Sequence, residues 1–453
     1  MTMTPQPPAV RPHARSRDEH DRRLTADVAV IGGGVIGHGI AWEARQSGRS
    51  VMIIDDAPGT GASWAAAGML APVSELHYQE EDLLELMLHS SGLWPAFAAG
   101  LESGRQSREP GADDPGTGYL TTSTLAVGAD AADRRALADL RGVQQASGLT
   151  VEPLTVREAR AQEPLLSPGI SCAFEIPADH QVDPRKLLAV ISDSLPGSTV
   201  RERAAGLLWE DGRVSGVSLA GGGTVHAGET ILANGLEAAS LDGLPPGLQL
   251  PLRPVYGDIL RLRVPAYLQP LVTSTVRGMV HGVPVYIVPR QDGTVVIGAT
   301  QREDALSGAG TAAAMAAPAG SSTPAGSAVS AGGVYQLLRD AQVLVPAVAE
   351  LELLEATARA RPGTPDNAPL LGRVADAGTG LDIAGLIIAT GFFRHGVLLT
   401  PAASSICRQL MDGDTDPRWA PFRPDRFSGL SAGPATPATP VHTVTIDPNK
   451  ETA

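Results

Sequence analysis

Near the start of the chain, two continuous apolar runs flank a segment in which apolar residues recur at helical spacing. Val28 to Ile31 are four consecutive apolar residues, and residues 51–54 form another such run. Runs of this kind are typical of strands buried on both faces of a parallel sheet. Between them, from residue 36 to residue 46, apolar side chains recur at the spacing of one helix face, and Gly48 provides a stop. The order strand, helix, strand predicts a βαβ unit.

Strand and helix signals continue along the rest of the chain. They predict helices at 187–195 and 398–411, and strands at 214–219, 224–226, 229–235, 259–264, 283–288, 294–297 and 386–391. Three glycines, Gly221 to Gly223, predict a hairpin turn between the first two of these strands. Strands of the buried, parallel type occur at the start, in the middle and at the end. The sequence therefore predicts the α/β class, with a discontinuous Rossmann-like domain and an inserted α+β domain built on an antiparallel sheet.

The predicted domains follow from this pattern and from local composition. The Rossmann-like domain is assigned residues 24–85, 178–250 and 362–427, and the inserted substrate domain residues 86–177 and 251–361. Biased composition predicts disordered tails at residues 1–23 and 428–453, and a flexible surface insertion at residues 305–333.

A glycine-rich turn carries the clearest functional signal. Gly32, Gly34 and Gly37 have the spacing G-x-G-x-x-G and follow the first strand directly. In such a unit the first glycine allows the tight turn, the second lets a pyrophosphate approach the backbone, and the third allows close helix packing. Asp55 ends the second strand, where an acid binds a ribose hydroxyl. The sequence thus predicts a dinucleotide site.

Two further runs favour a flavin over a nicotinamide. Residues 61–72 are mostly small, so a planar ring can lie against their backbone. Residues 392–399 follow the last strand, and we expect a helix to begin near Gly396. Its positive end would face the edge of a flavin where negative charge develops on reduction.

Charge and cysteine content narrow the class of partners. The 453 residues include 49 acidic and 35 basic side chains, a formal net charge of −14, which argues against nucleic acid or an anionic membrane as partner. No apolar segment approaches 18 residues and no secretory signal is apparent, so we expect a cytoplasmic protein without a membrane span. Cys172 and Cys407 lie far apart, and no metal site is predicted.

The chain resembles the D-amino-acid oxidase-like flavoproteins, and within them the glycine oxidase branch. The resemblance is carried by residues 32–37 and 61–72, together with Arg361 to Asp366 and Ala389 to Leu399. The resemblance spans about residues 27–427. It implies noncovalent FAD and oxidation of glycine to its imine, which yields glyoxylate and ammonia or supplies thiazole synthesis for thiamine, while O2 becomes hydrogen peroxide. A D-amino-acid or sarcosine oxidase or dehydrogenase of the same superfamily is the alternative. A homo-oligomer, specifically a homotetramer, and thiazole synthase as partner are implied only by resemblance.

The resemblance also implies which residues touch FAD and substrate. Those expected at FAD, besides the three glycines, are Val35, Ile36, Asp55, Asp56, Ser63, Trp64, Ala67, Gly68, Met69, Val182, Phe392, Phe393, Arg394, His395, Gly396, Val397 and Leu398. Arg361 is expected to bind the substrate carboxylate, with Tyr286 beside it and Arg394 at the flavin-side loop.

The chemistry of Arg361 fits this role independently of the resemblance. A guanidinium presents a rigid fork to a carboxylate, although a structural arginine is the more common fate of a single Arg. Gln301, Pro284 and the 305–333 insertion depart from the family pattern and put the substrate preference in doubt. A non-catalytic FAD-binding protein is the rival of another class, and the presence of Arg361, Tyr286 and Arg394 argues against it.

Overall fold

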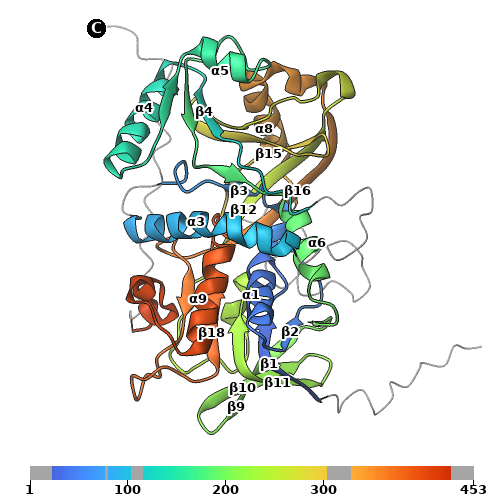
Figure 1. Ribbon diagram of the computed structural model, residues 1–453, viewed down its shortest axis with the longest axis vertical. Coiled ribbons are helices and arrows are strands. Elements are labelled where there is room, and N and C mark those ends of the chain that lie inside the picture. Colours follow the sequence, from blue (N-terminus) through green and yellow to red (C-terminus); the bar gives the residue numbers. More distant parts are fainter. Residues whose placement is uncertain (1–22, 77–79, 104–115, 304–327, 430–453) are drawn as a thin grey trace, which may run out of the picture.

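The chain is organised around two eight-stranded sheets, which lie one above the other in Figure 1. The computed structural model describes residues 23–76, 80–103, 116–303 and 328–429, and both sheets are built within these ranges. The predicted tails, apart from residues 23, 428 and 429, and most of the predicted insertion lie outside the described residues. In Figure 1, α3 (Glu81–Ser103) lies across the middle of the molecule, between the two sheets.

The first sheet has the strand order β17-β18-β11-β1-β2-β8, and β10 and β9 extend it from β11. Neighbours from β18 to β8 pair in parallel, while β17, β10 and β9 pair antiparallel. Its strands are β1 (Arg23–Ile31), β2 (Val51–Ile54), β8 (Thr199–Val200), β9 (Ala204–Glu210), β10 (Arg213–Leu219), β11 (Thr224–Leu232), β17 (Leu370–Gly372) and β18 (Leu386–Thr390).

One strand of this sheet is longer than the sequence pattern predicts. Thr224–His226 and residues 229–235 were expected as two strands, whereas β11 runs without a break from Thr224 to Leu232. Its first residues pair antiparallel with β10 and its last residues pair parallel with β18, while β1 pairs along its whole length. The break expected at Gly228 is therefore bridged by the ladder to β1.

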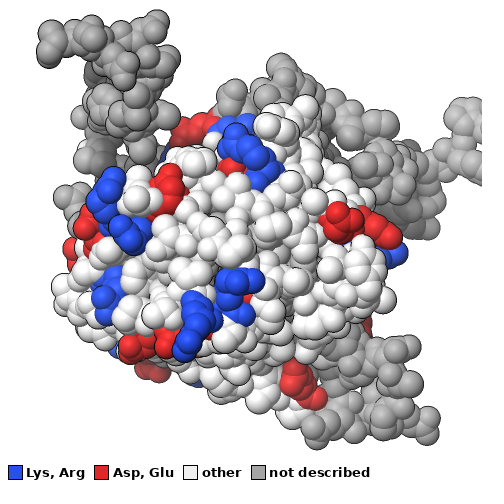
Figure 2. Space-filling view, turned by 90° about the horizontal axis from the view of Figure 1, so that it is seen from above, with Lys and Arg blue, Asp and Glu red and all other residues white. Residues whose placement is uncertain are grey.

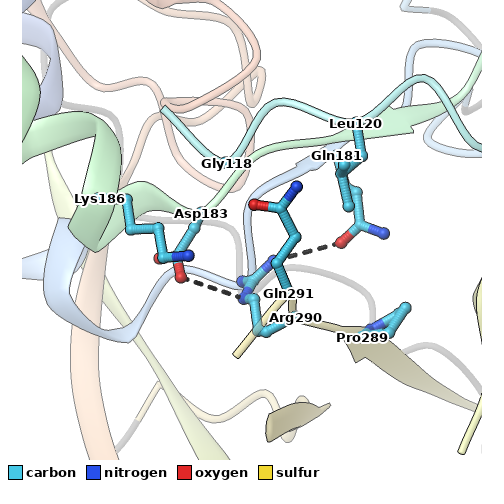
Figure 3. Close-up of a pocket in the computed structure, with 8 residues that line it drawn as sticks. All are labelled: Gly118, Leu120, Gln181, Asp183, Lys186, Pro289, Arg290 and Gln291. Atoms are coloured by element: carbon cyan, nitrogen blue, oxygen red, sulfur yellow. Dashed lines mark hydrogen bonds and ion pairs between the residues drawn. The ribbon is translucent and has the colours of Figure 1, made fainter. Parts of the chain in front are cut away.

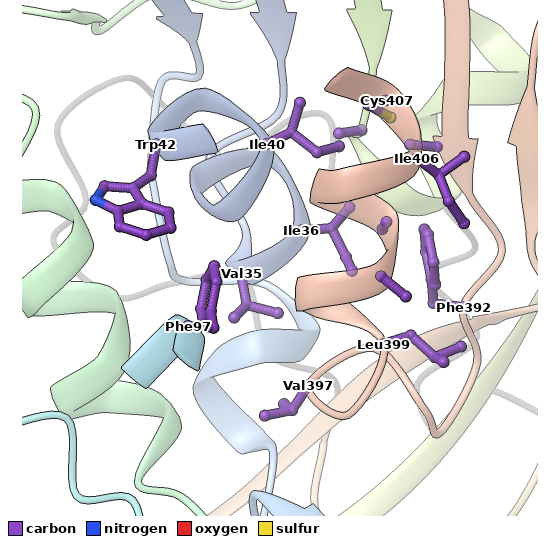
Figure 4. Close-up of a cluster of buried hydrophobic side chains, with 14 of the residues drawn as sticks. Val35, Ile36, Ile40, Trp42, Phe97, Phe392, Val397, Leu399, Ile406 and Cys407 are labelled. Carbon is purple, nitrogen blue, oxygen red and sulfur yellow. The ribbon is translucent and has the colours of Figure 1, made fainter. Parts of the chain in front are cut away.

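Helices α1 (Val35–Gln46), α3, α6 (Pro184–Asp193) and α9 (Thr400–Asp412) share one core with this sheet. Figure 4 shows Ile36 and Ile40 of α1 beside Ile406 of α9. The apolar side chains of α3, among them Trp94 and Phe97, belong to the same core. The domain boundary predicted after residue 85 therefore falls inside a helix that packs on the nucleotide half throughout its length.

The second sheet has the order β16-β12-β15-β14-β13-β4-β6-β5. All its pairs are antiparallel except β13 with β4, so the predicted antiparallel sheet is confirmed with one parallel pair. Its strands are β4 (Thr124–Gly128), β5 (Glu152–Leu154), β6 (Cys172–Ile176), β12 (Arg253–Arg263), β13 (Thr275–Val280), β14 (Val283–Pro289), β15 (Thr294–Gly298) and β16 (Glu352–Gly363).

The two faces of this sheet pack into different cores. Leu260 and Leu262 of β12 pack with helix α8 (Ala331–Leu344), while Ile259 packs with Ala65 and Ala67 of the nucleotide half. Alternate residues of a strand point to opposite faces, so β12 contributes to both cores. Helix α8 begins at Ala331, within the range predicted as flexible insertion.

The remaining elements connect the two sheets or cover their edges. They are α2 (Ala62–Ala65), β3 (Met69–Leu70), α4 (Ala131–Ala146), α5 (Val156–Gln162), β7 (His180–Gln181), η2 (Gly235–Ser240), η3 (Ala266–Leu268), η4 (Pro346–Glu350), η5 (Pro417–Phe422) and η6 (Pro424–Phe427). Strands β3 and β7 pair with each other and bring residues 69–70 beside residues 180–181.

The last helix begins later than the sequence pattern predicts. A start near Gly396 was expected, but residues 393–399 form turns and α9 begins at Thr400. Pro401 lies in its first turn, a position that proline favours because its missing N–H has no helical partner there. The turns before α9 leave the 392–398 segment as a loop.

The face of the molecule seen from above in Figure 2 carries charged side chains of both signs. Figure 2 shows basic and acidic side chains interspersed on the face seen from above, with broad uncharged areas between them. Among the helices in the described ranges, none is both long and apolar enough to cross a membrane.

We expect Gly37→Ala to destabilise the protein, because a Cβ at Gly37 would lie 1.9 Å from the carbonyl oxygen of Gly32. Backbone would have to shift, so the free energy of unfolding should fall by about 1–3 kcal/mol. Gly92→Ala is the matched control, since Gly92 lies within α3 with open space around its Cβ position. Alanine there should raise stability by about 0.5–1 kcal/mol. Denaturant unfolding measures both, and a Gly37→Ala variant as stable as the wild type would contradict this packing.

Candidate functional site

The glycine turn after β1 has the geometry of a pyrophosphate-binding loop. Gly32 has a φ of +107°, in the range that favours glycine, and the N–H of Gly33 donates to Asp55 Oδ2 at 2.6 Å. The N–H of Val35 donates to Ser63 Oγ at 3.0 Å. Gly32, Gly34, Val35, Gly37, Asp55 and Ser63 are thus brought together at the amino end of α1.

This turn fits the pyrophosphate of a dinucleotide. Gly34 is the first residue before α1, and its Cβ position faces the Ser63 hydroxyl at 3.3 Å. Bare backbone at a helix N-terminus, with the helix dipole behind it, is what a phosphate group requires. Both oxygens of Asp55 already accept a backbone N–H, from Gly33 and from Ala57 at 2.8 Å. Each carboxylate oxygen can accept a further bond, so a ribose hydroxyl stays a prediction for Asp55.

The small-residue segment 61–70 lies against the second sheet. Ala65 and Ala67 pack with Ile259, Val288 and Val296, and Met69 lies at the edge of this cluster. The N–H of Val182 donates to the carbonyl of Gly68 at 2.8 Å, which places two predicted FAD contacts side by side. We call this contact between residues 61–70 and the second sheet the seam.

Trp64 anchors one end of the seam. The Arg185 guanidinium lies 3.6 Å from the centre of its ring, and its Nε1 donates to Glu355 at 3.0 Å. Arg185 also pairs with Glu355 at 2.8 Å. Trp64 therefore packs against an ion pair between α6 and β16, which gives this predicted FAD residue a structural role of its own.

Arg290 crosses the seam at its other end. Figure 3 shows its guanidinium between Asp183 and Gln181. It donates to Gln181 Oε1 at 3.3 Å, to the carbonyl of Val182 at 3.2 Å, and to the carbonyl of Ala67. Burial lowers the pKa of Arg290 to about 10, against the opposing effect of Asp183, so it stays charged at neutral pH. Arg290 thus ties β14 to the two backbone segments expected to hold the flavin.

The loop 392–398 closes the site from the carboxyl side of β18. Phe393 has a φ of +47°, and its N–H donates to the carbonyl of Pro362 at 2.9 Å, next to Arg361. The carbonyl of Leu398 accepts from Ser90 Oγ at 2.7 Å and Trp94 Nε1 at 2.9 Å. The loop is therefore held both to the second sheet and to α3.

Arg361 and Tyr286 lie on the face of the second sheet that is turned toward the seam. Two glycines leave room for their polar ends. A Cβ at Gly257 would lie 2.2 Å from a guanidinium nitrogen of Arg361, and a Cβ at Gly298 would lie 2.4 Å from the Tyr286 hydroxyl. Gly257 is on β12 and Gly298 on its neighbour β15, so the two side chains reach toward each other from β16 and β14.

A partly buried carboxylate that the sequence did not indicate lies beside them. Glu75 Oε1 pairs with Nη1 of Arg277, and Glu75 Oε2 pairs with Nε of Arg394 at 2.9 Å. Arg277 is directly opposite Tyr286 on the neighbouring strand β13. Arg394 also approaches Glu80 at 3.8 Å. Two of the three arginines at this site are therefore neutralised by carboxylates of the protein.

Arg361 differs from the other two arginines. Among the residues that the structure describes, no ion pair or hydrogen bond of the Arg361 side chain is found. The Tyr286 hydroxyl lies within electrostatic reach of Arg361, Glu75 and Arg277. Of the three arginines near Tyr286 and Glu75, Arg361 is thus the one available to an incoming carboxylate. Arg261 of β12 also has guanidinium nitrogens without a hydrogen-bond partner, and it lies in the electrostatic surroundings of Arg185, Asp183 and Glu355.

Electrostatics follow from burial and from these pairs. Burial raises the pKa of Tyr286, which stays a neutral hydrogen-bond donor at neutral pH. Burial alone would also raise the pKa of Glu75, but Arg277, Arg394 and His395 hold this pKa well below its usual range. Asp179, which accepts from the N–H groups of Val73 and Ser74 at 2.9 Å, has its pKa raised by burial to about 6.

Two predicted residues lie away from this cluster. Asp56 is exposed and approaches Arg203 at 3.8 Å, so its side chain faces a surface arginine. Ile36 packs into the core shared by α1 and α9, which leaves only its backbone near the turn. The other predicted positions occur at the turn, the seam or the 392–398 loop, and their contacts with FAD stay predictions.

Glu75, Arg277, Asp179 and Arg290 were not found from the sequence. Arg277 lies in a short strand whose partner could be identified only from the pairing with β14. Glu75 follows the small-residue run without a motif of its own. The one signal for Glu75 is that an acidic residue follows shortly after Met69 and Leu70. The sequence alone does not distinguish such an acid from one on the surface.

The arrangement defines a class of protein. A bare glycine turn at a helix N-terminus, and a seam of small residues facing an available guanidinium on a second sheet, are typical of a two-domain flavin-dependent oxidoreductase. The model of the FAD dependent oxidoreductase family matches residues 27–410, and the chain belongs to this family. The predicted cofactor, FAD, and the predicted class of enzyme are thereby confirmed.

Similar proteins refine the comparison. Glycine oxidase of Geobacillus kaustophilus is 33% identical over 410 residues, which cover 89% of this chain and 97% of that protein. The bifunctional protein ThiO/ThiG of Trichormus variabilis is 29% identical over 413 residues. That match covers 89% of this chain but 55% of the relative, so the chain spans about half the length of this bifunctional protein.

Solved structures give the same fold. The crystal structure of glycine oxidase from Geobacillus kaustophilus matches with a TM-score of 0.73 and 29% identity, covering 89% of this chain and 99% of that one. Iminodiacetate oxidase from Chelativorans matches with a TM-score of 0.69 and 25% identity, covering 86% of this chain and 96% of that one. The predicted fold class is confirmed by these matches and by the two sheets.

The raised pKa of Asp179 predicts a pH dependence of stability. In the folded protein Asp179 holds its proton up to about pH 6, whereas an unfolded aspartate releases it near 3.8. Its contribution to stability is therefore fully present below pH 3.8 and is lost as the pH rises through about 6. Relative to Asp179→Asn, the wild type should lose about 3 kcal/mol of unfolding free energy between these two pH values. Denaturant unfolding of both proteins measures this difference, and parallel pH profiles would contradict it.

Proposed function

We propose that this chain oxidises small amines that carry one carboxylate, with glycine as its preferred substrate, and that it uses FAD and O2. The observation that carries the proposal is the availability of Arg361 on the face turned toward the seam, while Arg277 and Arg394 are paired with Glu75. The available guanidinium beside Tyr286 provides for one substrate carboxylate. The names of the similar proteins, glycine oxidase among them, support the same substrate class.

Substrate binding is assigned to Arg361 and Tyr286. The guanidinium fork would take the carboxylate through two parallel hydrogen bonds, each worth roughly 1.5–3 kcal/mol when charged groups are involved. The Tyr286 hydroxyl would donate to the same carboxylate, since burial keeps it neutral. Fixing the carboxylate fixes the position of Cα, and this positioning supplies much of the rate.

FAD would be held by the glycine turn and Asp55 at its nucleotide end, and by the seam and the 392–398 loop at its ring. Held there, FAD would supply hydride-accepting chemistry toward the substrate Cα, with O2 as the final oxidant and hydrogen peroxide as its product. Loss of the hydride from a neutral amine would give the protonated imine, which releases its extra proton to water, so no side-chain base is assigned. Glu75 is unsuited to that task because both of its oxygens are held by arginines. Water then converts the imine to glyoxylate and ammonia.

Further aspects of the proposal rest on relatives. The ThiO/ThiG proteins join a part similar to this chain to a second part, and this supports a supply of imine to thiazole synthase for thiamine. Noncovalent FAD attachment agrees with the lack of cysteine in residues 392–399. A homo-oligomer and a cytoplasmic location remain predictions. The alternative substrates are sarcosine and D-amino acids, and a quinone is the alternative electron acceptor.

The proposed function is tested by adding glycine to the purified, FAD-loaded protein without oxygen. We expect the yellow flavin absorbance to bleach with glycine, and to return with formation of peroxide when air is admitted. Sarcosine, D-alanine and D-proline form the comparison panel. If another amine bleaches the flavin and glycine does not, the assignment of glycine as substrate is wrong. If no amine bleaches it, the proposed oxidase activity is wrong.

Arg361→Ala should raise the apparent KM for glycine by at least about 10-fold, since both charge-assisted hydrogen bonds of the fork are lost and each is worth ~1.5–3 kcal/mol. The bound FAD should remain, because Arg361 contacts none of the glycine turn. Arg361→Lys keeps the positive charge but lacks the forked guanidinium, so its KM for glycine should lie between those of the wild type and of Arg361→Ala. Arg263→Ala is the control, because Arg263 is exposed at the far end of β12. Steady-state peroxide assays give KM and kcat, and an unchanged KM in Arg361→Ala would remove the assigned role.

A further inference from the structure

Glu75 pairs with two of the three arginines that lie near it and Tyr286. Its side chain is 12% exposed, and its two oxygens pair separately with Arg277 and Arg394, which are 21% and 23% exposed. These three residues come from three different parts of the chain: the segment after β3, strand β13 and the loop before α9. Without Glu75, Arg277 would lose its carboxylate partner beside Tyr286, and Arg394 would keep only the carboxylate of Glu80, at 3.8 Å.

We propose that Glu75 restricts this site to substrates with a single carboxylate, an inference that rests on the proposed function. A substrate with a second carboxylate, such as iminodiacetate, would find Arg277 and Arg394 already paired. Its second charge would then lie near the ionised Glu75, and like charges repel strongly where water is scarce. Glycine and N-methylated glycine present no such charge.

The placement of Glu75 supports a role in specificity rather than in proton transfer. Asp179 accepts from the N–H groups of Val73 and Ser74 and so fixes the backbone just before Glu75. The N–H of Glu75 itself donates to the carbonyl of Ala71 at 3.1 Å. The carboxylate is thus held in one position from its backbone and from both arginines. Asp179 approaches Arg277 through space while its own oxygens face backbone amides, so it does not replace Glu75.

Binding of two unreactive ligands to the FAD-loaded protein tests this proposal. Methoxyacetate has one carboxylate and diglycolate has two, and in both an ether oxygen stands where the substrate has its amine. Their dissociation constants can be followed by perturbation of the flavin absorbance or by calorimetry. For the wild type, we expect diglycolate to bind at least about tenfold more weakly than methoxyacetate.

Glu75→Gln removes the charge and keeps the shape. It should improve the affinity for diglycolate relative to methoxyacetate by roughly 10- to 100-fold, the range that one charge-assisted hydrogen bond supplies. The ratio of kcat/KM for iminodiacetate to that for glycine should rise in the same direction. Glu75→Asp keeps the charge and should keep the wild-type preference. Glu229→Gln is the matched control, because it removes a carboxylate from a partly buried pair with Arg373 in the nucleotide half.

The outcomes separate this inference from the proposed function. A wild type that is bleached by glycine and prefers methoxyacetate, with an unchanged ligand ratio in Glu75→Gln, would overturn the role of Glu75 alone. A wild type that binds diglycolate as tightly as methoxyacetate would also overturn it, even if Glu75→Gln does not fold. A wild type that neither bleaches with any amine nor binds either ligand would instead overturn the proposed function.

Discussion

The ionic contact of Glu75 with Arg277 and Arg394 joins the three parts of the chain that meet at the site. A guanidinium removed from water needs a carboxylate or several hydrogen bonds, and one buried carboxylate here serves two of them. Because the partners lie after β3, on β13 and before α9, the pairing fixes the second sheet and the last loop of the nucleotide half relative to the same point. The same contact leaves Arg361 as the available cation. Assembly of the site and its charge are therefore set by one interaction.

A second constraint is the alternation of side chains along the central strands of the second sheet. Leu260 and Leu262 of β12 face the core under α8, so Ile259 and Gly257 must face the nucleotide half. Gly257 and Gly298 have no side chains, and this leaves room for the Arg361 and Tyr286 side chains to lie across the two strands. The apolar pattern that builds the core thus also selects the face on which polar groups can meet the seam. Arg290, crossing that seam, holds the two halves at contact distance.

The sequence predicted those features that depend on neighbouring residues. The turn at Gly32 to Gly37, the helix after it and the hairpin at Gly221 to Gly223 all occur as expected, because local sterics and local hydrogen bonds decide them. Long-range pairing changed others. Strand β11 continues through Gly228 because β1 pairs with it, and α3 belongs to the nucleotide half because its apolar face packs there. The start of α9 moved to Thr400, where Pro401 occupies the first turn.

By itself the sequence determined the nucleotide fold, the family and the residue types suited to bind a carboxylate, since a strand followed at once by G-x-G-x-x-G has few other physical uses. It also singled out Arg361 for the substrate carboxylate, with Arg394 at the flavin-side loop. Only the tertiary structure decided which arginine is available, because neutralisation depends on a carboxylate more than two hundred residues away from Arg277 along the chain. An ion pair between distant segments leaves no recognisable pattern in the sequence. Backbone turns and the apolar faces of helices and strands do leave such patterns.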